Sequence, residues 1–225
     1  MAAVSLGAHD PAPAAMPLGR WHNRTVLSAP VPDFSVKPTL TGQRVVLRPF
    51  ALEQDAPALR QMLRDPESLR LTGSHSFAGI PGWDDAAETK FLSWYSTRNE
   101  QSDRLDLAVI DKGSGQCVGE VVLNEWVEGN RSCSFRTAIG PAGRDRGLGT
   151  EAVRMIVGYG FEQLALHRIA LEVYSINPRA RHVYEKVGFV AEGVLRDALH
   201  WDDQWIDATV MSILAPEWYR CRRYP

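Results

Sequence analysis

The stretch GRDRGLGTEAVRMIVGYGF, residues 143–161, decides the fold, because it passes within a few positions from glycines and charges to an apolar, helix-forming run. Glycines at a turn before a helix leave backbone N–H groups open to a ligand. The first helical turn adds unpaired N–H groups and a partial positive charge. With Arg144 and Arg146 beside them, these groups predict a cradle for a phosphate or diphosphate. A flexible glycine turn that feeds a core helix is the structural alternative.

The composition is that of an ordinary globular chain: 225 residues, 44% hydrophobic and 23% charged, with a net charge of −2. This charge gives no general attraction to nucleic acid or to an anionic membrane. The three cysteines form no C-x-x-C pair and no H-E-x-x-H motif occurs, so neither a disulfide framework nor a metal site is predicted. No apolar run approaches the roughly 18 residues that span a bilayer. We expect a cytoplasmic protein with no metal, membrane or nucleic-acid partner.

Two regions differ in composition. Residues 1–37 form a Pro/Ala-rich N-terminal extension without sustained periodicity, which we expect to be poorly ordered. The alternative is an arm that packs on the fold through Trp21 and Phe34. Residues 38–220 are predicted to form a single domain.

Periodicity and turn residues predict the order β-α-α-β-β-β-α-β-α-β-β for this domain. Hairpin-length turns make most neighbouring strands antiparallel, which gives an α/β fold with a mixed sheet. The almost wholly apolar strand around residues 169–173 is expected to be central and covered on both faces. Expected helices lie near 51–65, 85–99, 148–164 and 178–187, and expected strands near 44–50, 105–111, 117–127, 132–140, 167–177, 194–201 and 205–214.

Two other phosphate-binding motifs are alternatives for the glycine turn. A Walker loop is excluded, because no Gly-Lys-Ser/Thr follows. The spacing Gly147-x-Gly149-x-x-Ala152, with Glu172 downstream, fits a Rossmann fingerprint, so a dinucleotide-dependent oxidoreductase stays an alternative. Against it, seven residues separate Ile139 from Gly147, and the preceding strand belongs to a hairpin.

A different pattern fits better. Arg144-x-x-Gly147-x-Gly149 matches R/Q-x-x-G-x-G/A, and the segments FEQLALHRIALEV, N-x-x-A-x-x-VYEKVGF, AEGVLRDA and D-x-T-V-M-S-I-L accompany it. Here the chain resembles the GNAT N-acetyltransferase superfamily, in the branch of ribosomal-protein N-terminal (alanine/serine) acetyltransferases. The resemblance is close over 132–218, looser from 40, and absent over 1–37. It implies a mostly antiparallel sheet of six to seven strands with a central parallel wedge, about four flanking helices, and a homodimer as a possible assembly.

The resemblance also implies a site for acetyl-CoA as cosubstrate. Backbone amides of the glycine turn would hold its diphosphate, and the wedge beside the strand that ends at Ile139 would admit its pantetheine arm. Asn177 would hydrogen-bond the cofactor, although a plain helix N-cap explains it equally well. The implied cofactor-binding residues are Ala138, Ile139, Arg144, Asp145, Arg146, Gly147, Leu148, Gly149, Thr150, Asn177, Arg179 and Tyr184.

The implied catalytic residues are Tyr184, as the acid that protonates the departing thiolate, and Glu172, as the general base. A phenol with a pKa of about 10 is suited to protonate an alkyl thiolate. The alternatives are a core tyrosine for Tyr184 and, for Glu172, a carboxylate paired with Arg168 or another basic residue. Glu120 and Glu125 are weaker candidates for the base. No cysteine is placed for a covalent intermediate, so direct transfer is expected.

The acceptor is expected to be a primary amine. A protein N-terminal α-amine is favoured by the resemblance, and a polyamine, aminoglycoside or amino sugar is the alternative; a non-catalytic CoA-binding sensor is an alternative of another class. Aromatic residues of the early helices and the last hairpin are expected around the acceptor, namely His75, Phe77, Trp83, Trp94, Tyr95, Trp126 and Trp201.

Overall fold

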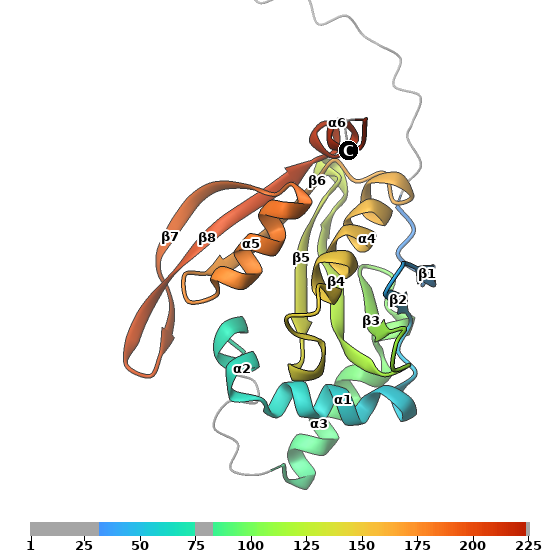
Figure 1. Cartoon of the computed structure of the whole chain (residues 1–225), viewed down its shortest axis with the longest axis vertical. Helices are drawn as coiled ribbons and strands as arrows, with labels where there is room; N and C mark the ends of the chain where they lie inside the picture. Colours follow the sequence, from blue (N-terminus) through green and yellow to red (C-terminus); the bar gives the residue numbers. More distant parts are fainter. Residues whose placement is uncertain (1–31, 75–82, 224–225) are drawn as a thin grey trace, which may run out of the picture.

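The computed structural model describes residues 32–74 and 83–223. One mixed sheet runs through this part of the chain in the order β1-β2-β3-β4-β5-β6-β8-β7 (Figure 1). Its strands are β1 (Leu40–Thr41), β2 (Val45–Arg48), β3 (Leu105–Asp111), β4 (Cys117–Val127), β5 (Ser132–Ile139), β6 (Arg168–Tyr174), β7 (Val190–Trp201) and β8 (Gln204–Leu214). The helices are α1 (Leu52–Arg64), α2 (Pro66–Thr72), α3 (Asp85–Ser96), α4 (Leu148–Glu162), α5 (Pro178–Val187) and α6 (Ala215–Arg223).

All neighbouring strands are antiparallel except β5 and β6, so the expected α/β class with one central parallel pair is confirmed. The described residues hold eight strands and six helices, more than the sequence suggested. The added elements are short or terminal: two-residue β1, seven-residue α2 and α6 at the end of the chain.

Helices cover both faces of the sheet. On one face α4 and α5 pack on the larger core, where the expected apolar stripe of α4 is fully buried at Val153, Ile156, Val157 and Phe161. On the other face α1 and α3 cover a smaller core around Leu59 and Phe91. Because side chains alternate along a strand, each residue of β3 to β6 faces either the α4/α5 face or the α1/α3 face.

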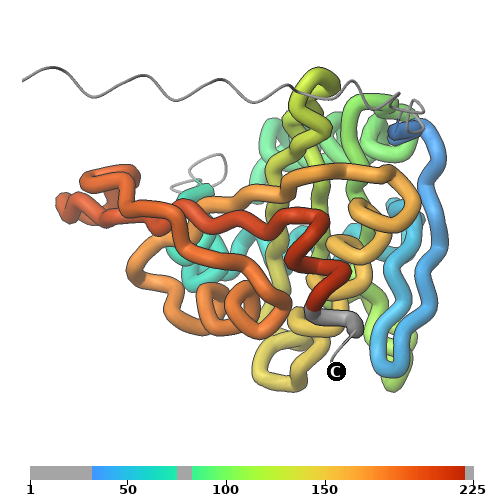
Figure 2. Tube along the Cα trace, turned by 90° about the horizontal axis from the view of Figure 1, so that it is seen from above, coloured from blue at the N-terminus to red at the C-terminus, as the bar shows by residue number. Residues whose placement is uncertain are grey.

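The outer edge of the sheet is a long hairpin. Strands β7 and β8 pair along most of their length and project beyond the rest of the sheet in both views (Figures 1 and 2). Register shifts lie between Ala191 and Gly193 and between Leu195 and Leu199.

The described part of the N-terminal region packs on the domain. Phe34 is 2% exposed within the larger core and lies against the ring of Trp126, 5.6 Å between centroids. Lys37 Nζ donates to the carbonyl oxygens of Phe34, Gln101 and Arg104. Residues 1–31, with Trp21, lie outside the described residues, so for them the prediction of a poorly ordered extension stays a prediction; residues 32–37 pack on the domain instead.

Candidate active site

A wedge opens in the middle of the sheet. The parallel pairing of β5 with β6 comprises Ser132 to Ser134 opposite Arg168 to Ala170 and then stops. Beyond that point β5 pairs only with β4, and β6 only with β8. The divergence expected before Ala138 and Ile139 is therefore present, and it leaves a strand edge on each side with backbone groups that an extended ligand can pair with.

The glycine turn lies at the wide end of this wedge. Helix α4 begins at Leu148 after Gly147, whose φ of 73° is favourable for glycine, and no side chain caps it. Within the described residues, no acceptor takes a hydrogen bond from the backbone N–H groups of residues 145–150. The first amide with a partner is that of Glu151, which donates to the Gly147 carbonyl at 3.4 Å. A free helix N-terminus of this kind fits an anionic group such as a diphosphate.

Two arginines beside this turn, Arg144 and Arg179, are paired with helix α2 and its N-cap. Arg144 donates to the carboxylates of Asp65 and Glu67, the latter at 2.5 Å, and to Ser68 Oγ at 2.6 Å. Arg179 forms ion pairs with Glu67 and, at 3.5 Å, with Asp145. These carboxylates lie on the guanidinium groups that the sequence assigned to phosphates. A diphosphate that used these guanidinium groups would have to compete with the carboxylates for them.

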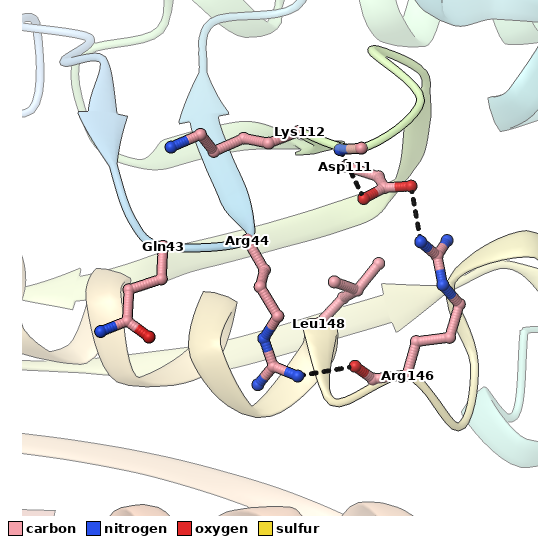
Figure 3. A pocket seen from close by; sticks show the side chains of 7 residues that line it. Gln43, Arg44, Asp111, Lys112, Arg146 and Leu148 are labelled. Carbon is pink, nitrogen blue, oxygen red and sulfur yellow. Dashed lines mark hydrogen bonds and ion pairs between the residues drawn. The ribbon is translucent and has the colours of Figure 1, made fainter.

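Arg146 points to the other side of the turn, into an open cavity of about 410 Å³ (Figure 3). Its Nη2 donates to Asp111 Oδ2 at 2.9 Å and its Nη1 to the Ala142 carbonyl. In the same cavity Arg44 donates to the Arg146 carbonyl at 3.0 Å. In this arrangement the Arg146 guanidinium is turned away from the wedge, so only the backbone of Arg146 can contact a ligand there.

Asn177 begins helix α5 at the opposite side of the wedge. Its Oδ1 accepts from the Ala180 amide at 3.1 Å, so the N-cap role is present. Its Nδ2 donates to the Leu71 carbonyl at 3.4 Å, which links α5 to the end of α2. Gly73 lies so close to Tyr174 of β6 that a Cβ there would be 2.7 Å from the ring. Helix α2 thus covers the open end of the wedge.

Tyr184 lies on the buried face of α5. Its ring is 6% exposed and meets Phe135 edge-on, 6.1 Å between centroids, at the point where β5 leaves β6. Within the described residues the hydroxyl has no hydrogen-bond partner. Burial raises the pKa of this phenol above its usual 10.0, so it stays protonated at neutral pH. A protonated hydroxyl without a protein partner at this place is suited to donate to a ligand atom in the wedge.

Glu172 differs from the expectation. Strand β6 is buried only through Ile169, Leu171 and Val173, and Glu172 is exposed on the α1/α3 face. Among the described residues the strand is covered on only one face, because α1 and α3 pack against β2, β3 and β4 and their core contains no residue of β6. The alternative of a pair with Arg168 is also wrong, since Arg168 binds Glu192 at 2.5 Å. Glu172 makes no hydrogen bond or ion pair with the described residues.

The aromatic residues expected around the acceptor fall into different places. On α3, Tyr95 is buried and donates to Glu120 of β4, whereas Trp94 is 44% exposed. Trp83 packs on Phe91. Trp126 packs with Phe34 in the larger core instead, so it does not line this site. Trp201 is half-buried at the end of β7. His75 and Phe77 lie outside the described residues.

A family model described as an acetyltransferase (GNAT) domain matches residues 44–190, well over half of the chain. The chain belongs to the GNAT acetyltransferase family. It is an acyltransferase whose acetyl donor is acetyl-CoA, and the alternative of a dinucleotide-dependent oxidoreductase is wrong.

Relatives of this GNAT domain carry several names. The spermidine N(1)-acetyltransferase of Escherichia coli is 31% identical over 127 residues, 56% of this chain and 67% of the relative. A Bacillus subtilis protein named "Putative ribosomal N-acetyltransferase YdaF" is 32% identical over 116 residues, 50% of this chain and 63% of the relative. The structure of a Vibrio cholerae spermidine N-acetyltransferase with CoA and spermine has a TM-score of 0.65 at 23% identity, covering 79% of this chain and 99% of that chain.

Sequence reasoning missed the carboxylates that hold the arginines of this GNAT site. Asp65 caps α2 by accepting from the Ser68 amide at 2.9 Å, and the pattern Asp-Pro-x-Ser signals such a cap. This pattern predicts where α2 begins, but it does not predict that Asp65 binds Arg144, which lies 79 residues further along the chain.

No helix of the described residues is long and apolar enough to cross a membrane, and no cluster of metal-ligating side chains occurs among them.

Proposed function

We propose that the protein transfers the acetyl group of acetyl-CoA directly to a primary amine of a small cationic molecule such as a polyamine. The observation that carries this proposal is the wedge between β5 and β6, which opens onto uncapped amides of residues 145–150 on one side and onto two carboxylates on the other. Glu172 of β6 and Glu120 of β4 both belong to the α1/α3 face, from which an acceptor would approach. Carboxylates favour a positively charged acceptor.

Acetyl-CoA supplies an activated thioester when bound. The amides of residues 145–150 would hold its diphosphate, and the free edges near Ala138 and Ile139 would pair with its pantetheine arm. The side chains of Asn177 and Arg179 would approach it only after their present partners on α2 are released.

Two side chains of the protein would each transfer one proton. Tyr184 would donate its hydroxyl proton to the departing sulfur. Glu172, exposed and without a partner among the described residues, would take the proton that the acceptor amine must lose before it attacks. Both roles are proposals that the burial of Tyr184 and the exposure of Glu172 support.

Transfer to a protein N-terminal α-amine is the second candidate. It is favoured by the resemblance to the ribosomal-protein branch and by the relative named for ribosomal N-acetylation. A homodimer and a cytoplasmic location stay predictions from the sequence.

Thiol release from acetyl-CoA tests the proposal with wild type and Tyr184→Phe. The acceptor panel contains spermidine, simple diamines, and peptides that begin with alanine or serine. We expect release with the amines and a fall in kcat of about 10²- to 10⁴-fold in Tyr184→Phe, with unchanged CoA affinity. Tight CoA binding without release from any acceptor would instead support a non-catalytic CoA sensor.

A further inference from the structure

Glu120 is a carboxylate in the middle of the sheet that takes no part in the two proposed proton transfers. It lies on β4 opposite Ala108 of β3 and Ala138 of β5, so two small side chains flank it. Its Oε2 accepts a hydrogen bond from the Tyr95 hydroxyl at 3.0 Å. The side chain is half-buried, which places a desolvated carboxylate within reach of a ligand.

The cations around Glu120 do not pair with it. Arg104 is bound in a bidentate pair to Asp106, at 2.6 and 2.7 Å. Arg98 donates to the Trp94 carbonyl and lies 3.9 Å above the Trp94 ring. Arg136 on β5 is exposed. Within the described residues Glu120 therefore has a neutral donor, Tyr95, and no ion pair.

An anion in this setting is poorly stabilised. Burial and the nearby Asp106 raise the pKa of Glu120, while the Tyr95 hydrogen bond and the charges of Arg136 and Arg104 oppose the rise. A cation that arrives with a ligand would restore the ionised form and be bound strongly in return.

The position of Glu120 sets the distance to that cation. Ala138 belongs to the part of β5 that borders the wedge. Glu120 lies opposite Ala138 on the next strand, β4, and adjacent strands are about 5 Å apart. A spacer of three or four carbons between two nitrogens spans about 5–6 Å, which is close to this inter-strand spacing.

We propose that Glu120, held by Tyr95, binds a second ammonium group of the acceptor, three or four carbons from the amine that is acetylated. The site then selects diamines and polyamines over monoamines. This inference rests on the proposed transfer to a small amine and names the residue that determines its specificity.

The test compares 1,4-diaminobutane with n-butylamine, which has the same carbon chain and lacks the second charge. Thiol release is measured with wild type, Glu120→Gln, Tyr95→Phe and the control Glu128→Gln, an exposed carboxylate outside the sheet. For Glu120→Gln we expect kcat/KM for the diamine to fall about 10- to 100-fold, chiefly through KM, with n-butylamine and CoA binding changed less than about twofold. Tyr95→Phe should lower the diamine value by about three- to tenfold, because only one neutral hydrogen bond to Glu120 is lost.

The outcomes separate this inference from the proposed function. If wild type has equal kcat/KM for the two amines, the role of Glu120 is overturned, while the proposed acetylation of amines is still supported. This measurement uses wild type alone and does not depend on the folding of a variant. An equal loss for both amines in Glu120→Gln would also overturn it, since a structural defect affects both alike. Release with neither amine would refute transfer to small amines, and the role of Glu120 with it.

Discussion

In the proposed site Glu67 would compete with the cofactor for two arginines, and its substitution should therefore strengthen CoA binding. The carboxylate binds Arg144 at 2.5 Å and also pairs with Arg179, and about half of its own side chain is exposed to solvent. Ion pairs with this exposure contribute about 0.2–1 kcal/mol each. Two of them together amount to about 1 kcal/mol, which is lost when both arginines turn to the diphosphate.

For Glu67→Gln we expect the Kd of CoA, measured by isothermal titration calorimetry at low ionic strength, to fall about fivefold. The gain should shrink below about twofold in 0.5 M salt, where exposed charges are screened. Glu185→Gln is the matched control, because it removes the same charge from an exposed pair on α5, with Arg181. Asp65 is unsuitable, since it also caps α2. Unchanged or weaker CoA binding in Glu67→Gln, relative to Glu185→Gln, would refute the competition.

Three further substitutions test other parts of the structure. Phe34→Ala should lower the free energy of unfolding by about 3–5 kcal/mol in urea titrations, because the ring is buried in the larger core; a loss below about 1 kcal/mol would contradict that burial. Gly147→Ala should weaken CoA binding and lower Tm, since φ is 73° and the new Cβ would lie 2.9 Å from Arg44 Nη1. A variant with the CoA affinity and the Tm of wild type would contradict this expectation. The Arg168 guanidinium and the Ser212 hydroxyl lower the pKa of Glu192 to about 2, so this pair stabilises the fold above pH 4.5 and loses its effect as the pH falls toward 2. Glu192→Gln should accordingly cost up to about 1 kcal/mol at pH 7 and almost nothing near pH 2, and equal costs at both pH values in denaturant titrations would contradict the assignment.

The features that the sequence predicted correctly depend on local chemistry. The apolar stripe of α4 follows from helical spacing, and the bounds of α5 follow from Asn177, Pro178 and Gly188. The position of the wedge, in contrast, was expected from the family resemblance. The parallel pairing of β5 with β6 ends at Ser134 and Ala170, before Ala138 and Ile139.

The features that it missed depend on partners far along the chain. Glu172 was expected in apolar surroundings because its neighbours in sequence are apolar, yet it is exposed because the core under α1 and α3 does not extend to β6. Arg144 and Arg179 were assigned to phosphates from their place beside helix N-termini, and only the fold brings Glu67 to both. Tyr95 and Glu120 were noted separately, and their hydrogen bond joins α3 to β4.

The central claim is that backbone amides of the glycine turn hold the diphosphate of the cofactor. Amide chemical shifts of isotope-labelled protein, recorded by NMR during titration with CoA and in parallel with pantetheine, test it most directly. We predict the largest shifts at residues 145–150 with CoA and small ones there with pantetheine, which lacks the diphosphate. Equal shifts with both ligands, or CoA-dependent shifts confined to other segments, would contradict the account.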